Sequence, residues 1–158
     1  MQKISTCLWF DNRAEEAVNF YTSVFKNSKI GTAARYDEAG SKAAGMPAGS
    51  VMTMTFELEG RQFMALNGGP LFKFNESISL VINCENQEEI DYYWEKLTSG
   101  GGNESQCGWL KDKFGLSWQV VPAELGLLMS SKESGKAQRV MSELLKMKKL
   151  DINVLRNA

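Results

Sequence analysis

The sequence contains no histidine among its 158 residues, and this absence limits the chemistry that its side chains can perform. Histidine is the commonest metal ligand and the commonest general base near neutral pH. Its absence excludes Ser-His-Asp and Cys-His catalysis and any His-ligated zinc site. Proton transfer would have to use a carboxylate, lysine, tyrosine, cysteine or bound water. Glu57, Glu59, Tyr36 and Lys73 have suitable side chains, but no motif places them in a site.

The three cysteines, Cys7, Cys84 and Cys107, form no CxxC pair, and each falls in a stretch that is typical of a strand. Their odd number and their positions predict reduced core thiols. The N-terminal residues lack the apolar core of a signal peptide, and no apolar run approaches the roughly 18 residues of a membrane span. We therefore expect a cytoplasmic protein without a membrane segment.

Composition limits the class of partner. The chain is 43% hydrophobic and 23% charged, with a net charge of −1, which is typical of a globular protein. So balanced a charge gives no long-range attraction to a phosphate backbone, and we expect no nucleic-acid partner. The length fits one domain spanning residues 1–158.

The first half of the chain predicts the order β-α-β-β-β. Apolar residues recur at helical spacing from Ala14 to Phe25, after a strand and the turn signal Asp11-Asn12. Residues 37–49 are rich in glycine, alanine and serine and predict a flexible loop. The predicted strands cover residues 3–10, 28–36, 51–59 and 61–66, the last two as a hairpin.

The second half repeats this order less clearly. A helix is predicted over residues 87–97, closed by three glycines at 100–102. Three strands are clear, and a fourth, short one is inferred near residues 102–104. A helix over residues 135–150 follows, with a docking side formed by Ala137, Val140, Met141, Leu144, Leu145 and Lys148. The three clear strands cover residues 77–84, 105–111 and 116–121.

The two halves can be aligned at an offset of 73 residues, which places Glu15-Glu16 over Glu88-Glu89 and Thr6 over Ser79. Together with the repeated order of elements, this favours a duplication. The predicted fold is α+β, with paired β-α-β-β-β modules forming curved mixed sheets around a cleft, plus a C-terminal helix. The modules would be residues 3–67 and 77–122, followed by a helical tail over 123–158.

Alternation within the strands separates a polar face from an apolar one. Ser79, Val81 and Asn83 share one face of their strand, and Ser117, Gln119 and Val121 share one face of theirs. The apolar faces belong under the helices. The mixed faces are candidates to line the cleft, although they could equally face solvent or another subunit.

Several motifs resemble those of the PhnB-like family, whose members are often labelled 3-demethylubiquinone-9 3-methyltransferase domain proteins. This family belongs to the vicinal oxygen chelate superfamily of glyoxalases, bleomycin-resistance proteins and dioxygenases. The resemblance covers most of the chain and extends into the tail, at residues 136–141 and 146–149. Its main carriers are Leu8-Trp9-Phe10, Glu16-Ala17, Phe20-Tyr21, Phe25, residues 65–70, residues 108–112 and residues 115–122.

The resemblance implies a homodimer and metal ligands on the first and last strands of each module in the metal-using relatives. The matching positions here are Thr6, Ala65 or its face-mate Asn67, Ser79 and Gln119. None offers a carboxylate or an imidazole, so we expect no tightly bound metal and no cofactor.

Methyl transfer from S-adenosylmethionine normally uses a glycine-rich turn from a strand into a helix. The glycines at 100–102 follow a predicted helix instead, so we expect no methyltransferase activity. The preferred hypothesis is a binding module for an unknown, partly apolar small molecule. Its neutral hydrogen-bonding groups would be Thr6, Asn67, Ser79 and Gln119, with Phe72 and Trp109 in the apolar wall.

Two alternatives stay open. The first is a superfamily enzyme of lyase, isomerase or dioxygenase type, which would act without a metal or with a weakly held one. The second is a dimeric interaction protein, because a polar sheet face can serve an interface equally well.

Overall fold

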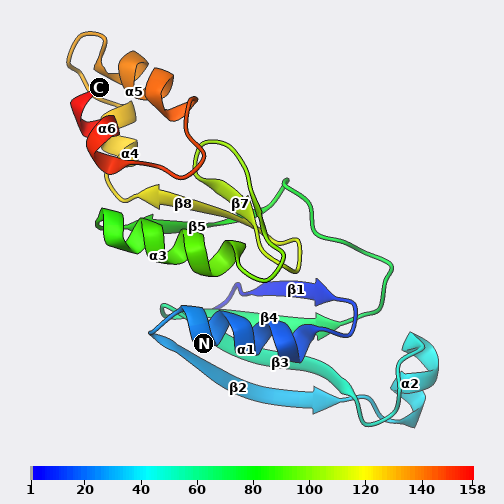
Figure 1. The fold of residues 1–158 in the computed structure, drawn as a ribbon. Coiled ribbons are helices and arrows are strands. Elements are labelled where there is room, and N and C mark those ends of the chain that lie inside the picture. Colours follow the sequence, from blue (N-terminus) through cyan, green and yellow to red (C-terminus); the bar gives the residue numbers. More distant parts are fainter. Residues whose placement is uncertain (1) are drawn as a thin grey trace. The chain divides into compact units, whose positions relative to one another are not determined.

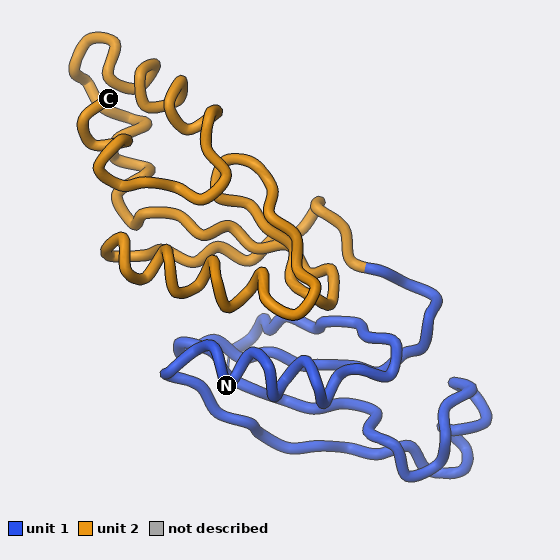
Figure 2. The backbone as a smooth tube through the Cα atoms, viewed as in Figure 1, with its two compact units in different colours: residues 1–73 blue, residues 74–158 orange. Residues whose placement is uncertain are grey.

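The computed structural model describes residues 2–158, which form two compact units divided between residues 73 and 74 (Figures 1 and 2). Each unit contains a four-stranded mixed sheet with a helix along one face. The α+β prediction with paired β-α-β-β-β modules is therefore confirmed.

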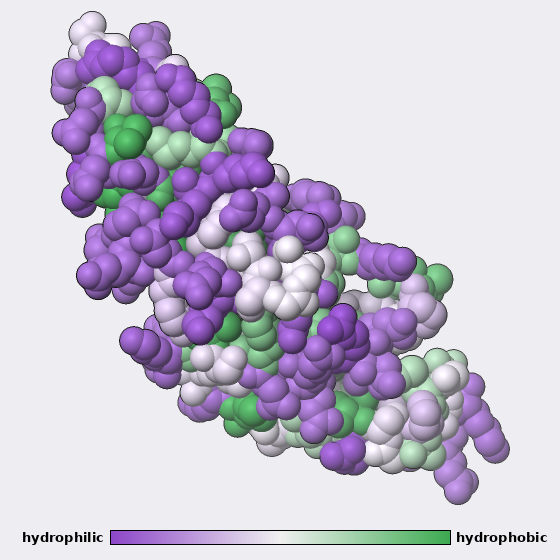
Figure 3. Space-filling model, viewed as in Figure 1, coloured by the Kyte–Doolittle hydropathy of each residue, from purple (hydrophilic) through white to green (hydrophobic). Residues whose placement is uncertain are grey.

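Within residues 2–158, no helix has the length and apolar character needed to cross a membrane. Hydrophilic side chains cover most of the face shown in Figure 3.

The sheet of the first unit has the strand order β1-β4-β3-β2. Strand β1 runs parallel to β4, while β3 pairs antiparallel with both β4 and β2. The helix α1 connects β1 to β2. The bounds are β1 Thr6–Phe10, α1 Ala14–Val24, β2 Ser28–Arg35, β3 Val51–Leu58 and β4 Arg61–Asn67.

Packing of α1 on this sheet is largely aromatic. The Tyr21 ring, which is fully buried, stacks on Phe56 with ring centroids 6.2 Å apart, and Phe56 stacks on Phe63 at 5.2 Å. Ala14, Ala17, Val18 and Val24 complete the buried side of the helix. We call the face of the sheet under α1 its covered face and the opposite one its open face.

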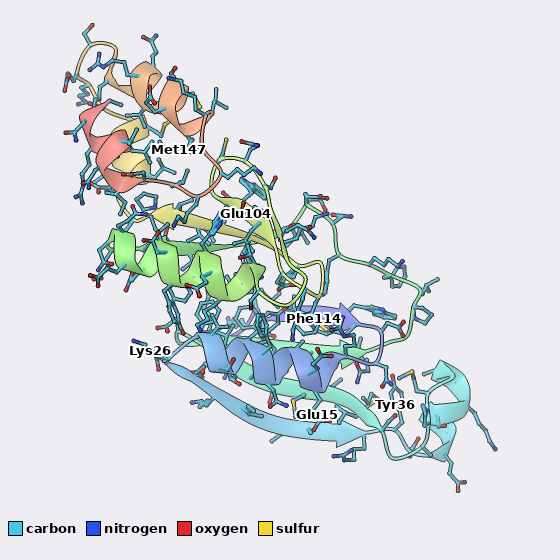
Figure 4. All side chains as sticks on the ribbon, in the orientation of Figure 1. Glu15, Lys26, Tyr36, Glu104, Phe114 and Met147 are labelled. Carbon is cyan, nitrogen blue, oxygen red and sulfur yellow. The ribbon has the colours of Figure 1, made fainter. Side chains whose placement is uncertain are left out.

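The second unit repeats the topology with the order β5-β8-β7-β6 and with α3 between β5 and β6. Ile90, Trp94 and Leu97 form the buried side of α3. The Trp94 indole donates to the carboxylate of Glu104 on β6 at 2.8 Å, a residue labelled in Figure 4. The bounds are β5 Ser79–Cys84, α3 Gln87–Thr98, β6 Asn103–Glu104, β7 Trp109–Lys111 and β8 Ser117–Pro122.

Asp112 fixes the turn between β7 and β8. Its carboxylate is 2% exposed and accepts bonds from the backbone N–H groups of Phe114 and Leu116 and from the Trp118 indole, at 2.9, 3.1 and 2.8 Å. Burial of this charge is possible because it accepts several hydrogen bonds. The turn therefore sets the position of β8 relative to β7.

Three short helices form the tail: α4 Leu125–Met129, α5 Lys136–Leu144 and α6 Ile152–Asn157. Val121, at the end of β8, packs with Val140, Leu150 and Leu155 in one apolar cluster. The segment between α5 and α6 also bonds to the main chain before β7. Cys107 N–H donates to the Met147 carbonyl and Gly108 N–H to the Lys148 carbonyl, both at 2.8 Å (Met147 is labelled in Figure 4).

Three local predictions were wrong. The predicted flexible loop contains the helix α2, Glu38–Ala44, because Asp37 caps it by accepting from Gly40 N–H at 2.7 Å. The strand predicted from residue 105 begins only at Trp109, after a turn in which Cys107 has a φ of 59°. The tail helix predicted to residue 150 ends at Leu144, where the following carbonyls bond to residues 107 and 108 instead.

The expected short strand near residues 102–104 is present as β6. Two of the cysteines do not lie in the core, contrary to the sequence-based prediction. Cys84 is buried, but Cys7 is exposed and Cys107 is half-buried, and all three are free thiols.

Candidate functional site

The open face of the first sheet carries a row of polar side chains across three strands. Lys29 on β2, Glu57 on β3 and Gln62 on β4 are register partners. The Lys29 ammonium lies 3.3 Å from the Glu57 carboxylate. A second row contains Thr55, Met64 and Cys7.

The residues of these rows other than Cys7 line a pocket of about 280 Å³. Its wall combines an ion pair, neutral polar groups and the thioether of Met64. Such a mixture suits a ligand with both polar and apolar parts. The lining residues are Ser5, Lys29, Gly31, Thr55, Phe56, Glu57, Gln62, Phe63 and Met64.

An irregularity in β2 shapes the pocket edge. The pairing of β2 with β3 shifts register between Ile30 and Ala33, and Thr32 N–H donates to the Thr55 hydroxyl at 2.9 Å. A Cβ atom on Gly31 would lie 2.3 Å from that hydroxyl oxygen. Glycine is therefore required for β2 to approach Thr55 so closely.

An aromatic pair lies in the same unit near the end of β1. The Trp9 indole donates to the Gly69 carbonyl at 2.9 Å, and the Phe72 ring contacts Trp9 edge-on with centroids 4.9 Å apart. Phe72 is 59% exposed. A Cβ atom on Gly68 would lie 2.3 Å from the indole, so this turn also needs glycine. Phe72 thus forms an exposed aromatic pair with Trp9 and does not line the pocket described above.

The open face of the second sheet brings three of the predicted residues together. Gln119 on β8 lies between its register partners Val81 and Trp109, and its amide donates to the Ser79 hydroxyl at 2.9 Å. All three candidates, Ser79, Trp109 and Gln119, are half-buried.

The next row of the same face contains Ser79, Ser117 and Lys111, which are register partners across β5, β8 and β7. Ser117 is 1% exposed, and its hydroxyl has no hydrogen-bond partner. The Lys111 ammonium pairs with the Glu76 carboxylate, which holds the pKa of Glu76 below its usual value.

Thr6 and Asn67, the predicted residues of the first unit, lie on the covered face. Thr6 pairs with buried Phe63. The Asn67 side chain is 3% exposed; it accepts from Ala14 N–H at 2.9 Å and donates to the Val51 carbonyl at 3.0 Å. The side-chain oxygen of Asn67 thus holds the start of α1, and its amide holds the start of β3.

Thr6 lies on the covered face, unlike Ser79, because the loop before α1 is one residue longer than the loop before α3. Two residues separate Phe10 from the cap residue Arg13 of α1, whereas Glu85 alone separates Cys84 from the cap residue Asn86 of α3. The offset of 73 therefore holds for the helices, where buried Tyr21 matches buried Trp94, but not for the preceding strands. A shift of one residue in a strand exchanges its two faces.

The sequence analysis did not identify Lys29, Gln62 or Lys111. It named Ser117 only as part of a mixed strand face and Glu57 only by side-chain type. No local pattern distinguishes these residues, because their proximity depends on strand register. Alternation within β3 and β4, once paired as a hairpin, would have placed Glu57 beside Gln62.

The four superfamily ligand positions do not form a set that fits a divalent metal ion. Ser79 and Gln119 bond to each other, while Thr6 and Asn67 lie on the covered face of the other sheet. Among residues 2–158, no group of three or more cysteine, aspartate or glutamate side chains could hold a metal ion. Divalent ions prefer anionic oxygen or imidazole, which these positions lack.

The repeated β-α-β-β-β units define the fold class of the vicinal oxygen chelate superfamily. The fold is shared with protein PA1353 from Pseudomonas aeruginosa at 17% identity and a TM-score of 0.60, covering 77% of this chain and 98% of that one. It is also shared with the fosfomycin resistance protein FosX from Listeria monocytogenes, whose structure was determined with Mn(II) and sulfate. That likeness has 13% identity and a TM-score of 0.53, covering 77% of this chain and 91% of that one.

The chain belongs to the PhnB-like family. The family model described as 3-demethylubiquinone-9 3-methyltransferase matches residues 2–121. The PhnB protein from Bacillus cereus is 40% identical, with a TM-score of 0.67, covering 76% of this chain and 99% of that one. No curated protein gives a significant match.

Proposed function

We propose that this protein binds a small, partly apolar molecule on the open face of its first sheet, without a tightly held metal ion. The observation that carries the proposal is the pocket of about 280 Å³ lined by both polar and apolar side chains. Pockets for drug-sized ligands measure roughly 300–1,000 Å³, so the volume suits a small metabolite.

Side-chain chemistry limits the ligand further. Met64 supplies a flexible apolar surface, and Thr55 and Gln62 supply neutral hydrogen-bonding groups beside it. The carboxylate of Glu57 already has the Lys29 ammonium as its partner, so the pocket carries no uncompensated charge from this pair. A neutral molecule with an apolar body and one polar edge matches these walls.

The donor chemistry of the site supports a metal-free mode of binding, because the pocket offers one carboxylate and no thiol or imidazole. Two features argue against methyl transfer despite the family description. Both sheets are mixed and four-stranded rather than doubly wound, and the glycines at 100–102 follow α3 instead of preceding a helix.

The first test is a thermal-shift screen of the purified protein against a collection of small metabolites, followed by calorimetry of each hit. The Met64→Gln variant should weaken binding of an apolar hit by about three- to tenfold, since it replaces apolar surface with an amide. Met141→Gln is the matched control, because Met141 lies on α5 in the other unit and is 40% exposed. The proposal is wrong if no compound binds, or if both variants affect binding equally.

Elemental analysis by mass spectrometry tests the metal-free part. The protein is incubated with excess Zn²⁺, Ni²⁺, Mn²⁺ or Fe²⁺ and then desalted. We expect well below one metal ion per chain. A stoichiometric ion would contradict the proposal and favour the metal-dependent enzyme considered from the sequence.

A further inference from the structure

The second unit has a row of three hydrogen-bonding side chains, one of which, the Ser117 hydroxyl, has no partner within the described residues. Ser79, Ser117 and Lys111 lie side by side on the open face of the second sheet, each in register with the next. Side chains that are directly opposite on neighbouring strands lie roughly 4.5–5.5 Å apart at Cβ, so one small group can contact several of them.

Ser117 is the unusual member of this row. Its side chain is 1% exposed and its hydroxyl oxygen has no hydrogen-bond partner. Buried hydroxyl groups are nearly always paired in folded proteins, because an unpaired one loses its hydration without compensation. An apolar residue would have filled the same space without that cost, so the hydroxyl indicates a partner outside the chain.

The neighbours of Ser117 define the chemistry of that partner. The Ser79 oxygen accepts from the Gln119 amide, which leaves the Ser79 hydroxyl hydrogen to donate. Lys111 uses its ammonium on the Glu76 carboxylate, and an ammonium carries three donors. The row therefore presents two hydroxyl donors and an ammonium whose present partner is the exposed Glu76 carboxylate, a combination that suits an anionic oxygen group able to compete with Glu76.

We propose that Ser79, Ser117 and Lys111 bind the carboxylate of a small organic acid, whose apolar body lies along Trp109 and Val81. Trp109 and Val81 occupy the adjacent row, on either side of Gln119. A carboxylate is favoured over a phosphate, since one ammonium balances a single negative charge and Glu76 already adds another. The contact between Lys111 and Glu76 shows that this ammonium pairs with a carboxylate.

This site lies within residues 74–158 and is separate from the pocket of the first sheet, so either proposal can fail alone. Benzoate is the probe, with benzyl alcohol as its uncharged analogue and inorganic phosphate as the competing anion. Binding is followed in the ¹⁵N-labelled protein by the amide shifts of the three row residues. We expect benzoate to shift these amides and benzyl alcohol and phosphate to bind more weakly.

Four variants sharpen the test. Lys111→Gln should weaken benzoate binding by about tenfold, because it removes a charge-assisted bond, and Ser117→Ala should weaken it severalfold. Glu76→Gln should strengthen binding, since it removes the carboxylate that competes for Lys111. Lys96→Gln on α3 removes a positive charge away from the row and should leave binding unchanged.

Three results would overturn the proposal: no amide shift with benzoate at millimolar concentration, equal affinity for benzyl alcohol, or unaltered binding in Lys111→Gln. Tighter binding of phosphate than of benzoate at the same amides would overturn the assignment to a carboxylate. If Ser117→Ala fails to fold, Lys111→Gln and Glu76→Gln still decide the outcome, because these two side chains lie at the surface, 36% and 63% exposed.

Discussion

The two sheets share one topology but place opposite charges at the same position of the open face. Glu57 on β3 and Lys111 on β7 each pair with the first open-face residue of the neighbouring strand, Gln62 or Ser117. Glu57 is neutralised by Lys29 from the same sheet, whereas Lys111 is neutralised by Glu76 from the segment before β5. The duplicated fold therefore fixes where a side chain projects but leaves its chemistry free to diverge.

The helices show the same divergence in their anchors. The N-terminus of α1 is held from a distant strand, by the Asn67 side chain on Ala14 N–H. The N-terminus of α3 is held locally, by Asn86 on Glu89 N–H at 2.9 Å and by the Glu89 carboxylate on Glu85 N–H at 2.8 Å. The bond from Asn86 is an N-cap, and the Glu89 carboxylate reaches back to the residue before that cap. Because Asn67 on β4 also bonds to β3, it should contribute more to the stability of the fold than the local cap at Asn86.

Thiol labelling gives the largest expected contrast between the units. Burial raises the pKa of Cys84 to about 12, and the nearby Glu89 charge adds to this effect. At pH 8 such a thiol is about one part in ten thousand thiolate. Burial also raises the pKa of Cys7, but Cys7 is exposed on the open face of β1.

Peptide mapping after iodoacetamide treatment at pH 8 should therefore show Cys7 modified on the order of a hundredfold faster than Cys84. The raised pKa also means that the folded state favours the protonated thiol of Cys84. The stabilisation of the folded state by this thiol is therefore present below pH 9 and declines as the pH rises toward 12. Equal labelling of Cys7 and Cys84 in the folded protein would contradict the assignment of the two strand faces.

Replacement of the distant anchor should have the largest effect on stability. Asn67→Ala leaves the Ala14 N–H and the Val51 carbonyl without their partner. We expect the free energy of unfolding to fall by roughly 2–4 kcal/mol, measured by urea denaturation. A loss under about 0.5 kcal/mol in Asn67→Ala would show that this anchor contributes little to stability.

Replacement of the local cap should cost less. Asn86→Ala removes the bond to Glu89 N–H at the exposed start of α3. The expected loss is about 1 kcal/mol by the same urea measurement, as for an ordinary N-cap. A loss equal to that of Asn67→Ala would remove the distinction between distant and local anchors.

The smallest expected effect concerns the contact between the tail and α3. Lys149 lies 2.6 Å from Asp91, and hydrogen bonds from Lys149 and Gln87 lower the pKa of the Asp91 carboxyl group. A lowered pKa stabilises the folded state above the ordinary pKa of aspartate, and this contribution is lost as the pH falls through the lowered value. Lys149→Gln should raise the Asp91 pKa in a ¹³C NMR titration. An unchanged pKa would show that the ion pair does not form in solution.

Periodicity predicted most strands and both long helices, because each buries one regular face. It did not predict α2, where a cap at Asp37 outweighs a glycine- and alanine-rich composition, or the end of α5 at Leu144. On the second sheet, Gln119 bonds to Ser79 and is the register partner of Trp109, but their role in a site stays a prediction. The face of Thr6 depended on one loop residue, and the row of Lys29, Glu57 and Gln62 depended on register, which one strand alone does not reveal.

The attachment of the tail has a consequence for divergence among proteins of this kind. Residues 122–158 lie beyond the part of the chain that the family model matches. Two of the hydrogen bonds that join them to the rest of the second unit use main-chain atoms only, at residues 107 and 108. Substitution at Cys107 or Met147 can leave those two bonds in place, whereas Gly108 has a φ of 82° and no space for a Cβ atom beside the Val120 carbonyl. The main-chain part of this attachment therefore tolerates side-chain substitution at Cys107 and Met147, but it depends on glycine at position 108.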